Sequence, residues 1–189
     1  MAYYYLAAQL PYLVYGQNPP MSSASFRELC LSSLSADDAA LLDLCTLDPE
    51  KGGKVSSAGE SLDVSSEVID AWRVWERALR LNLARYRAQK LKREGGASID
   101  PPEHPASAAA AAKTASAIDS PLEAELFLDK SRWDAIEAFQ GIDYFNRNTI
   151  YAYLLKLQLM ERRALFRVDE GFAEYKGLYT AIMAASENT

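Results

Sequence analysis

The side chains that could carry out chemistry in this sequence are few and far apart. Catalysis needs convergent groups, such as a nucleophile beside a base, paired carboxylates or a cluster of metal ligands. The only histidine, His104, stands among prolines, and the only cysteines, Cys30 and Cys45, lack the spacing of a zinc or redox motif. Gly52-Gly53-Lys54 has neither the spacing of a phosphate-binding loop nor an apolar strand before it. We therefore predict that the protein is not an enzyme and holds no cofactor or metal ion.

Acidic residues occur at predicted helix starts rather than as a catalytic pair. Asp37 and Asp38 stand in the first turn of one predicted helix, and Glu123 and Glu125 in the first turn of another. Carboxylates at these positions interact favourably with the helix dipole, which is an ordinary structural role. We therefore assign them no ligand.

Basic residues are concentrated between Trp72 and Glu94. This segment has a net charge of +6, counted from the sequence, although the whole chain has a net charge of −6. A basic helix on an acidic protein can contact an anionic partner, or its charges can be solvated or paired internally. The overall charge argues against general nucleic-acid binding. The candidate partner contacts in this segment are Arg80, Arg87 and Lys90.

A second set of candidate contacts lies on a predicted amphipathic helix. Apolar residues recur at intervals of three and four across residues 150–164, which predicts one apolar stripe. On the same helix, Arg162 and Arg163 either belong to a docking face, are solvated, or pair with the preceding helix through Asp134 or Glu137. The candidate contacts here are Tyr151, Lys156, Glu161, Arg162 and Arg163.

The segments that carry these candidate residues have helical sequence patterns. They predict an all-α protein that consists of two helical hairpins or a small bundle. Capping residues and apolar spacing mark the helices. Gly141 predicts a short turn that joins the last two helices as an αα-hairpin. The predicted helices are Phe26–Leu31 with Ser25 as N-cap, Ser35 to about Leu47, Ser65 or Ser66 to Arg93, Leu122–Gln140 with a joint at Ser131, and a last helix that Asp143 or Asn146 caps and that breaks near Gly171.

Two segments interrupt the predicted helices. Lys51–Ser61 is a flexible loop by composition, and Gly95–Ser120 combines prolines with an alanine-rich run that has no large side chain to bury. We interpret the second as a mobile insert, which separates an N-terminal helical part (1–94), the insert (95–120) and a C-terminal hairpin (121–189) of the same domain. The expected core residues are Trp72, Trp75, Leu79, Trp133, Phe139, Ile150, Tyr153, Leu157 and Met160.

Residues 1–15 are apolar and aromatic. Their sequence is compatible with a helix or a strand, and we expect the segment to be buried against the rest of the protein. It lacks the positive start of a signal peptide, and it is too short, and too interrupted by Gln9 and Pro11, to span a membrane. We therefore expect a cytoplasmic location, in which Cys30 and Cys45 remain free thiols.

The stretch Tyr151–Leu178, YAYLLKLQLMERRALFRVDEGFAEYKGL, resembles the C-terminal helix of the C subunit of V-type and archaeal A-type ATPases (the d subunit of eukaryotes). The shared elements are Tyr153-Leu154, then Lys156 and Glu161, the arginines and a Gly-Leu ending. The N-terminal YYYLAAQLPYL and the overall plan look closer to an uncharacterised bacterial family, domain of unknown function 2764, whose members are encoded among V-type ATPase subunits. These motifs cover roughly a quarter of the chain.

The resemblance implies a non-catalytic subunit or assembly factor of a bacterial V-type ATPase, similar to the C subunit, which couples the central stalk to the membrane ring. It implies partners among the stalk or ring subunits, a role in proton or sodium transport, and a place at the inner face of the cell membrane held through partners alone. The C subunit has three similar helical repeats and is much longer than 189 residues, so a shorter chain has room for only some of its contacts.

The residues alone also allow a different function. In this alternative the protein is a cytosolic helical adaptor that binds another anionic partner through the basic helix at residues 72–93. Binding of that kind depends steeply on salt concentration, because counterions are released when the charges meet.

Overall fold

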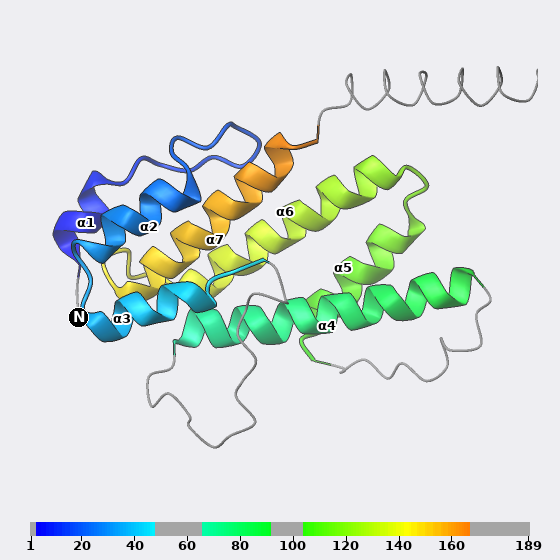
Figure 1. Ribbon diagram of the computed structural model, residues 1–189. Helices are drawn as coiled ribbons and strands as arrows, with labels where there is room; N and C mark the ends of the chain where they lie inside the picture. The colour runs from blue at the N-terminus through cyan, green and yellow to red at the C-terminus, as the bar shows by residue number, and fades with distance from the viewer. Residues whose placement is uncertain (1–2, 48–65, 92–103, 167–189) are drawn as a thin grey trace, which may run out of the picture.

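The computed structural model describes residues 3–47, 66–91 and 104–166, and every regular element within these ranges is helical (Figure 1). This confirms the predicted all-α class. The elements are α1 (Tyr4–Gln9), α2 (Ser23–Leu31), α3 (Ala36–Leu41), the short 3-10 turn η1 (Leu42–Leu44), α4 (Glu67–Lys90), α5 (Ala106–Ala117), α6 (Pro121–Gln140) and α7 (Arg147–Ala164).

The helices form a bundle in which α7 lies between α2 on one side and α4 and α6 on the other. Helix α4 packs against α5, α6 and α7, and α6 packs against both α5 and α7 (Figure 1). On its other side, α7 packs against α2. The turn between α6 and α7 is made by Gly141, whose φ of +75° suits glycine because a Cβ is disfavoured in that conformation. The predicted αα-hairpin is therefore confirmed.

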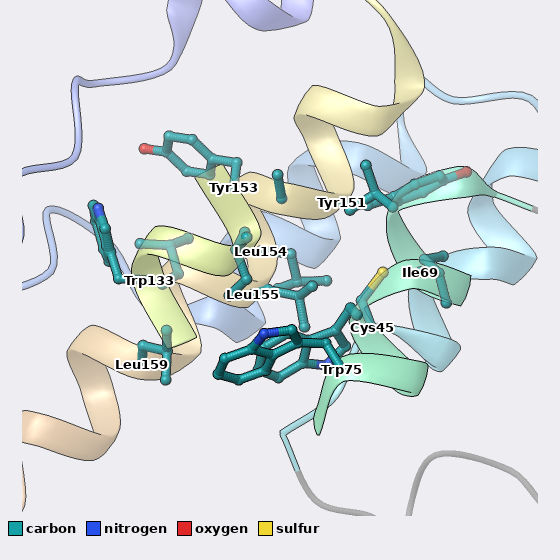
Figure 2. Close-up of a cluster of buried hydrophobic side chains, with 14 of the residues drawn as sticks. Cys45, Ile69, Trp75, Trp133, Tyr151, Tyr153, Leu154, Leu155 and Leu159 are labelled. Atoms are coloured by element: carbon teal, nitrogen blue, oxygen red, sulfur yellow. The ribbon is translucent and has the colours of Figure 1, made fainter. Parts of the chain in front are cut away.

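The core surrounds α7, which is buried on nearly all sides. All residues from 150 to 157 are buried, and Figure 2 shows Tyr151 and Tyr153 leaving opposite sides of the helix. The sequence predicted one apolar stripe on this helix. The buried surface of α7 is wider than that stripe, because α7 has neighbours on several sides. Each of the predicted core residues is buried except Phe139, which is partly buried against the core.

Helix α4 is the long basic helix that the sequence predicted. Its buried face carries Trp72 and Trp75, whose rings stack with their centroids 6.0 Å apart. The Trp72 indole N–H donates a hydrogen bond to the Thr46 carbonyl at 3.3 Å, which ties the end of the N-terminal part to α4. Trp72 and Trp75 are therefore core residues, as their spacing predicted.

The alanine-rich segment is a packed helix rather than a mobile insert. Helix α5 packs against α4 and α6. Alanine contributes little area of its own, but its small side chain lets a large neighbour such as Trp75 come close, and the Trp75 indole N–H donates to the Ser107 hydroxyl at 3.0 Å. The prediction for 95–120 is thus wrong over residues 104–120, while residues 95–103 lie outside the described residues. The buried residues of α5 are Ala108, Ala111, Ala112 and Ala115.

Two predictions about serine residues are corrected. Helix α2 begins at Ser23 rather than Phe26, because the Ser22 hydroxyl, and not that of Ser25, caps it by accepting from the Ser25 N–H at 3.0 Å. Helix α6 has no joint at Ser131. The Ser131 hydroxyl instead donates to a backbone carbonyl of the preceding turn at 2.9 Å, as serine does inside a continuous helix.

Other caps follow the sequence prediction. The Ser35 hydroxyl accepts from the Asp38 N–H at 3.3 Å and begins α3, and the Asn146 side chain, rather than Asp143, caps α7. Helix α3 is shorter than predicted, since the helical turns end with η1 at Leu44.

The N-terminal segment is helical in α1 and only half buried. The Tyr3 hydroxyl donates to the buried Asp38 carboxylate, and the Tyr3 N–H donates to the Phe145 carbonyl in the turn before α7. The expectation that the whole segment is buried is wrong, because tyrosines on one side of α1 face solvent. The buried apolar side chains are Tyr3, Leu6 and Leu13, and the exposed ones are Tyr4, Tyr5, Tyr12 and Val14.

Within the described ranges, none of the helices has the length and apolar character needed to cross a bilayer. The predicted loop at Lys51–Ser61 and the predicted break near Gly171 lie outside the described residues.

Candidate functional site

The structure separates the predicted contact residues into two groups. Arg80, Arg87 and Arg162 meet at one cleft between α4, α6 and α7. Lys90, at the end of α4, lines a neighbouring cavity together with Arg87. The remaining candidates have partners inside the protein; they are Tyr151, Lys156, Glu161 and Arg163.

A buried ion-pair network forms the base of the cleft. Arg132 of α6 donates from Nε and Nη2 to Glu76 of α4 at 3.1 and 3.2 Å, and from Nη1 to Asp129 at 3.1 Å. All three side chains are buried. Arg80 shares Glu76 by donating from Nε at 2.7 Å. The network fastens α4 to α6, and its members are costly to remove singly because each would leave a buried charge without its partner.

Arg162 of α7 extends the network toward the surface. Its Nη2 donates to Glu125 at 2.8 Å, and its Nη1 lies 3.7 Å from Asp129. The predicted pairing with Asp134 or Glu137 is wrong, because Arg162 faces the N-terminal half of α6 rather than the half that carries those two acids. The hairpin places antiparallel helices in this register, so the end of α7 meets the beginning of α6.

Asp129 is the least compensated charge in this network. Its side chain is 1% exposed, and its Oδ2 atom has no hydrogen-bond partner. Burial raises the pKa of the Asp129 carboxyl above its ordinary value, although Arg162 and Arg132 act in the opposite direction. Burial also opposes the charge of Arg132, but Glu76 and Asp129 outweigh it and hold the pKa of Arg132 above its ordinary value. The guanidinium therefore stays charged.

Above this base the cleft opens to solvent with a volume of about 300 Å³. Arg87 reaches Glu125 at 3.6 Å, which counts as an ion pair but is too long for a hydrogen bond. Guanidinium groups with donors to spare bind carboxylates and phosphates. The arrangement is therefore suited to binding an anion. The cleft is lined chiefly by Arg80, Arg87, Arg132 and Arg162, and Glu125 is the acid among its described lining residues.

Tyr151 and Lys156 are inside the bundle, so their assignment as partner contacts is wrong. The Tyr151 hydroxyl donates to the Asp38 carbonyl at 3.0 Å, and burial raises the pKa of this phenol. The Lys156 ammonium donates to Glu137 at 3.3 Å and lies 5.1 Å from the centroid of the Trp133 ring. Both are buried because α7 has helices on opposite sides, which the sequence pattern of one helix does not reveal.

Glu161 and Arg163 hold the N-terminal segment against α7. The Glu161 carboxylate accepts from the N–H and the hydroxyl of Ser23 at 2.6 and 2.7 Å, at the start of α2, where the helix dipole favours a negative charge. The Arg163 guanidinium lies 5.0 Å from the centroid of the Tyr15 ring. These contacts give both residues a structural role.

An exposed aromatic surface, which sequence reasoning missed, lies where α1 meets the turn between α6 and α7. The Tyr4 and Phe145 rings have centroids 5.0 Å apart, and a groove of about 290 Å³ runs beside them. Tyr12 and Ile142 are the most exposed members, at 88% and 93%. We define the aromatic surface as Tyr4, Tyr12, Ile142, Tyr144 and Phe145.

One sequence signal could have revealed this surface. Ile142, Tyr144 and Phe145 fall in the short turn between Gly141 and Asn146, and residues of such a turn have little chance of burial. Large apolar side chains in an exposed turn are a mark of a contact surface.

The cysteines and the histidine do not line the cleft between α4, α6 and α7. Cys30 and Cys45 are buried free thiols, as expected, and burial raises the pKa of Cys30 to about 12. His104 is exposed just before α5. In the parts of the chain that are described, no cluster of His, Cys, Asp and Glu has the arrangement of a metal site.

Comparison with known proteins finds no match for this chain. No protein-family model matches the sequence, and neither a curated protein nor a solved structure matches it. The proposal for its function therefore rests on the aromatic surface and on the sequence motifs of Tyr151–Leu178 and of the N-terminal segment.

Proposed function

We propose that the chain is a non-catalytic subunit or assembly factor of a bacterial V-type ATPase, similar to the C subunit, and that it contacts the central stalk or the membrane ring. The observation that carries the proposal is the exposed aromatic surface on an all-helical bundle. Isolated exposed apolar residues are ordinary, but a group of them beside a groove marks a protein–protein contact. A stalk component needs such a contact and a rigid body behind it.

Rigidity of the body supports the same proposal. The aromatic surface is not carried by a loose loop, because the Tyr3 N–H bonds the Phe145 carbonyl and the Tyr153 hydroxyl donates to the Pro11 carbonyl at 2.9 Å. The second contact attaches the N-terminal half of the surface to α7, and the first joins that half to the turn before α7. A component that transmits torque between partners requires a contact surface fixed to its core in this way. In this proposal the protein lies at the inner face of the cell membrane, held through its partners.

The proposal is tested by weakening the aromatic surface without touching the core. Tyr12→Ser with Ile142→Ser removes two exposed side chains, so stability should change little, while recovery of ATPase subunits with the tagged protein should fall by at least about tenfold, as for central residues of an interface.

The matched control is Val74→Ser with Leu122→Ser. These side chains are also exposed and apolar, but Val74 lies on α4 and Leu122 at the start of α6, and neither belongs to the aromatic surface. Leu122 is about 30 Å along α6 from the turn. Recovery at the wild-type level is expected for the control. Equal recovery of subunits with both double variants would contradict the proposed contact surface.

A cytosolic adaptor for an anionic partner is the second candidate function. It is favoured by the basic side chains of α4 that remain exposed, Arg77, Arg85 and Lys90, for which no ion pair is seen with the described part of the chain. Arg80 and Arg87 serve this function less well, because they pair with Glu76 and Glu125. This function would be favoured over the first if three results were obtained together. The protein would bind an anionic partner with a steep dependence on salt concentration, Arg77→Glu would abolish that binding, and Tyr12→Ser with Ile142→Ser would leave it intact.

A further inference from the structure

We propose that the cleft between α4, α6 and α7 is a binding site for a phosphate-type oxyanion, either inorganic phosphate or the phosphate of a small phosphomonoester. Three helices contribute its arginines, and its volume of about 300 Å³ accommodates such an anion together with some of its water. The inference does not depend on the proposed function, since it rests on this cleft alone.

The cleft has an excess of positive charge. Among the described residues, four guanidinium groups line it, and three carboxylates pair with them. Arg132 at the base is 6% exposed and held by three hydrogen bonds, so it is a fixed positive charge rather than a mobile surface group. The three carboxylates are those of Glu76, Glu125 and Asp129.

Donors remain available on the solvent side of the cleft. The Arg87 guanidinium lies 3.6 Å from Glu125, which is too far for a hydrogen bond, and its side chain is 65% exposed. Arg80 uses Nε for Glu76 and Nη2 for the Leu47 carbonyl, at 2.7 and 2.9 Å, which leaves Nη1. A bound anion can therefore take hydrogen bonds from these groups without breaking the buried network.

The distribution of these donors over two side chains favours a tetrahedral anion over a carboxylate. A carboxylate is planar and is best satisfied by two parallel N–H groups of one arginine, which is how Glu76 binds Arg132. The spare donors come instead from two separate guanidiniums of α4, those of Arg80 and Arg87. Donors on separate side chains can each bind a different oxygen of a phosphate, which offers more acceptor oxygens than a carboxylate.

Glu125 is the competitor for this site. Its two oxygens accept from Arg162 at 2.8 Å and face Arg87 at 3.6 Å, so it occupies the position of an anion and repels another one. Its side chain is 32% exposed and can turn toward solvent. Neutralising Glu125 should therefore tighten phosphate binding, whereas neutralising Arg87 should weaken it. A purely structural network predicts neither effect.

The test is isothermal titration of the full chain with inorganic phosphate, and separately with glycerol phosphate, at pH about 8 and low, constant ionic strength. Glu125→Gln should tighten binding roughly 3- to 10-fold, and Arg87→Gln should weaken it by a similar factor, as expected for one charge a few ångströms away at an effective dielectric constant between protein and water. Binding of both ligands assigns the site to phosphate in general, and binding of one alone identifies the source.

The variants are chosen so that folding does not decide the outcome. Arg162→Gln is avoided because it removes a partner of the buried Asp129, while Arg87 is largely exposed. Arg85→Gln and Asp134→Asn are the matched controls for loss of one charge on α4 and on α6, and they should leave the affinity unchanged. No measurable binding of either ligand, or binding that Glu125→Gln and Arg87→Gln leave unchanged, overturns the proposal.

Discussion

Arg132 of α6 donates two hydrogen bonds to Glu76 of α4, at 3.1 and 3.2 Å, and both side chains are buried between the helices. This pair, with Asp129 on the other side of the guanidinium, determines how α4 and α6 face each other. The same geometry positions the arginines above it, so this contact contributes both to the shape of the cleft and to the stability of the bundle.

Removing Arg132 should therefore destabilise the bundle strongly. Arg132→Ala leaves the carboxylates of Glu76 and Asp129 buried without this cation, and we expect the free energy of unfolding to fall by about 3–5 kcal/mol. Urea denaturation followed by circular dichroism measures the change. Lys130→Ala removes a cation from an exposed pair on the same helix and should cost about 0.5 kcal/mol or less. Similar losses for the two variants would contradict the buried network.

The packing of α5 gives a second prediction. Ala112 is completely buried against its neighbours, so Ala112→Leu should overpack the contact and lower the free energy of unfolding by about 1–3 kcal/mol. Ala110→Leu, at an exposed position of the same helix, should be close to neutral. Thermal or urea unfolding of both variants distinguishes the two cases. Equal stability of both would mean that α5 does not pack against α4 and α6.

The Tyr3–Asp38 hydrogen bond gives a prediction about pH. Burial opposes ionisation of Asp38, but hydrogen bonds from Tyr3 and Arg147 outweigh it and hold the pKa of the carboxyl below its ordinary 3.8. A depressed pKa in the folded state stabilises the protein above the ordinary value, and this stability is lost as pH falls through the folded-state pKa.

Tyr3→Phe removes one of these donors. We expect it to lower the free energy of unfolding at neutral pH by about 1–2 kcal/mol, and we expect the difference from wild type to narrow as pH falls below 3.8, where Asp38 becomes protonated in both proteins. Denaturation of each protein across this pH range is the measurement. Tyr5→Phe, at an exposed tyrosine, is the control and should show no pH-dependent difference. A constant difference for Tyr3→Phe at all pH values would refute the coupling to Asp38.

Local sequence patterns predicted local structure well. The spacing of Trp72 and Trp75 placed α4 and its buried face, because apolar periodicity directly records which side of a helix is covered. The turn at Gly141 was likewise readable, and the cap of the next helix was narrowed to Asp143 or Asn146, of which Asn146 is the cap, since each feature depends on a few adjacent residues.

What could not be predicted depends on packing between distant segments. The alanines of α5 carry no apolar area that signals burial, so their order comes from Trp75 and other neighbours. Lys156 looks like a surface residue in its own helix, and only the position of α7 inside the bundle shows that it is buried. Arg80, Arg87 and Arg162 were selected as contacts, but their meeting in one cleft requires the register of three helices.

The central proposal is that the protein belongs to a V-type ATPase, and the most direct test is affinity purification of the tagged full chain from membranes of its native host, with mass spectrometry of the co-purifying chains. We predict recovery of central-stalk or membrane-ring subunits in near-equal amounts with the tagged protein. Recovery of none of them, together with an intact and active motor in a strain that lacks the gene, would contradict the proposal and favour the adaptor function.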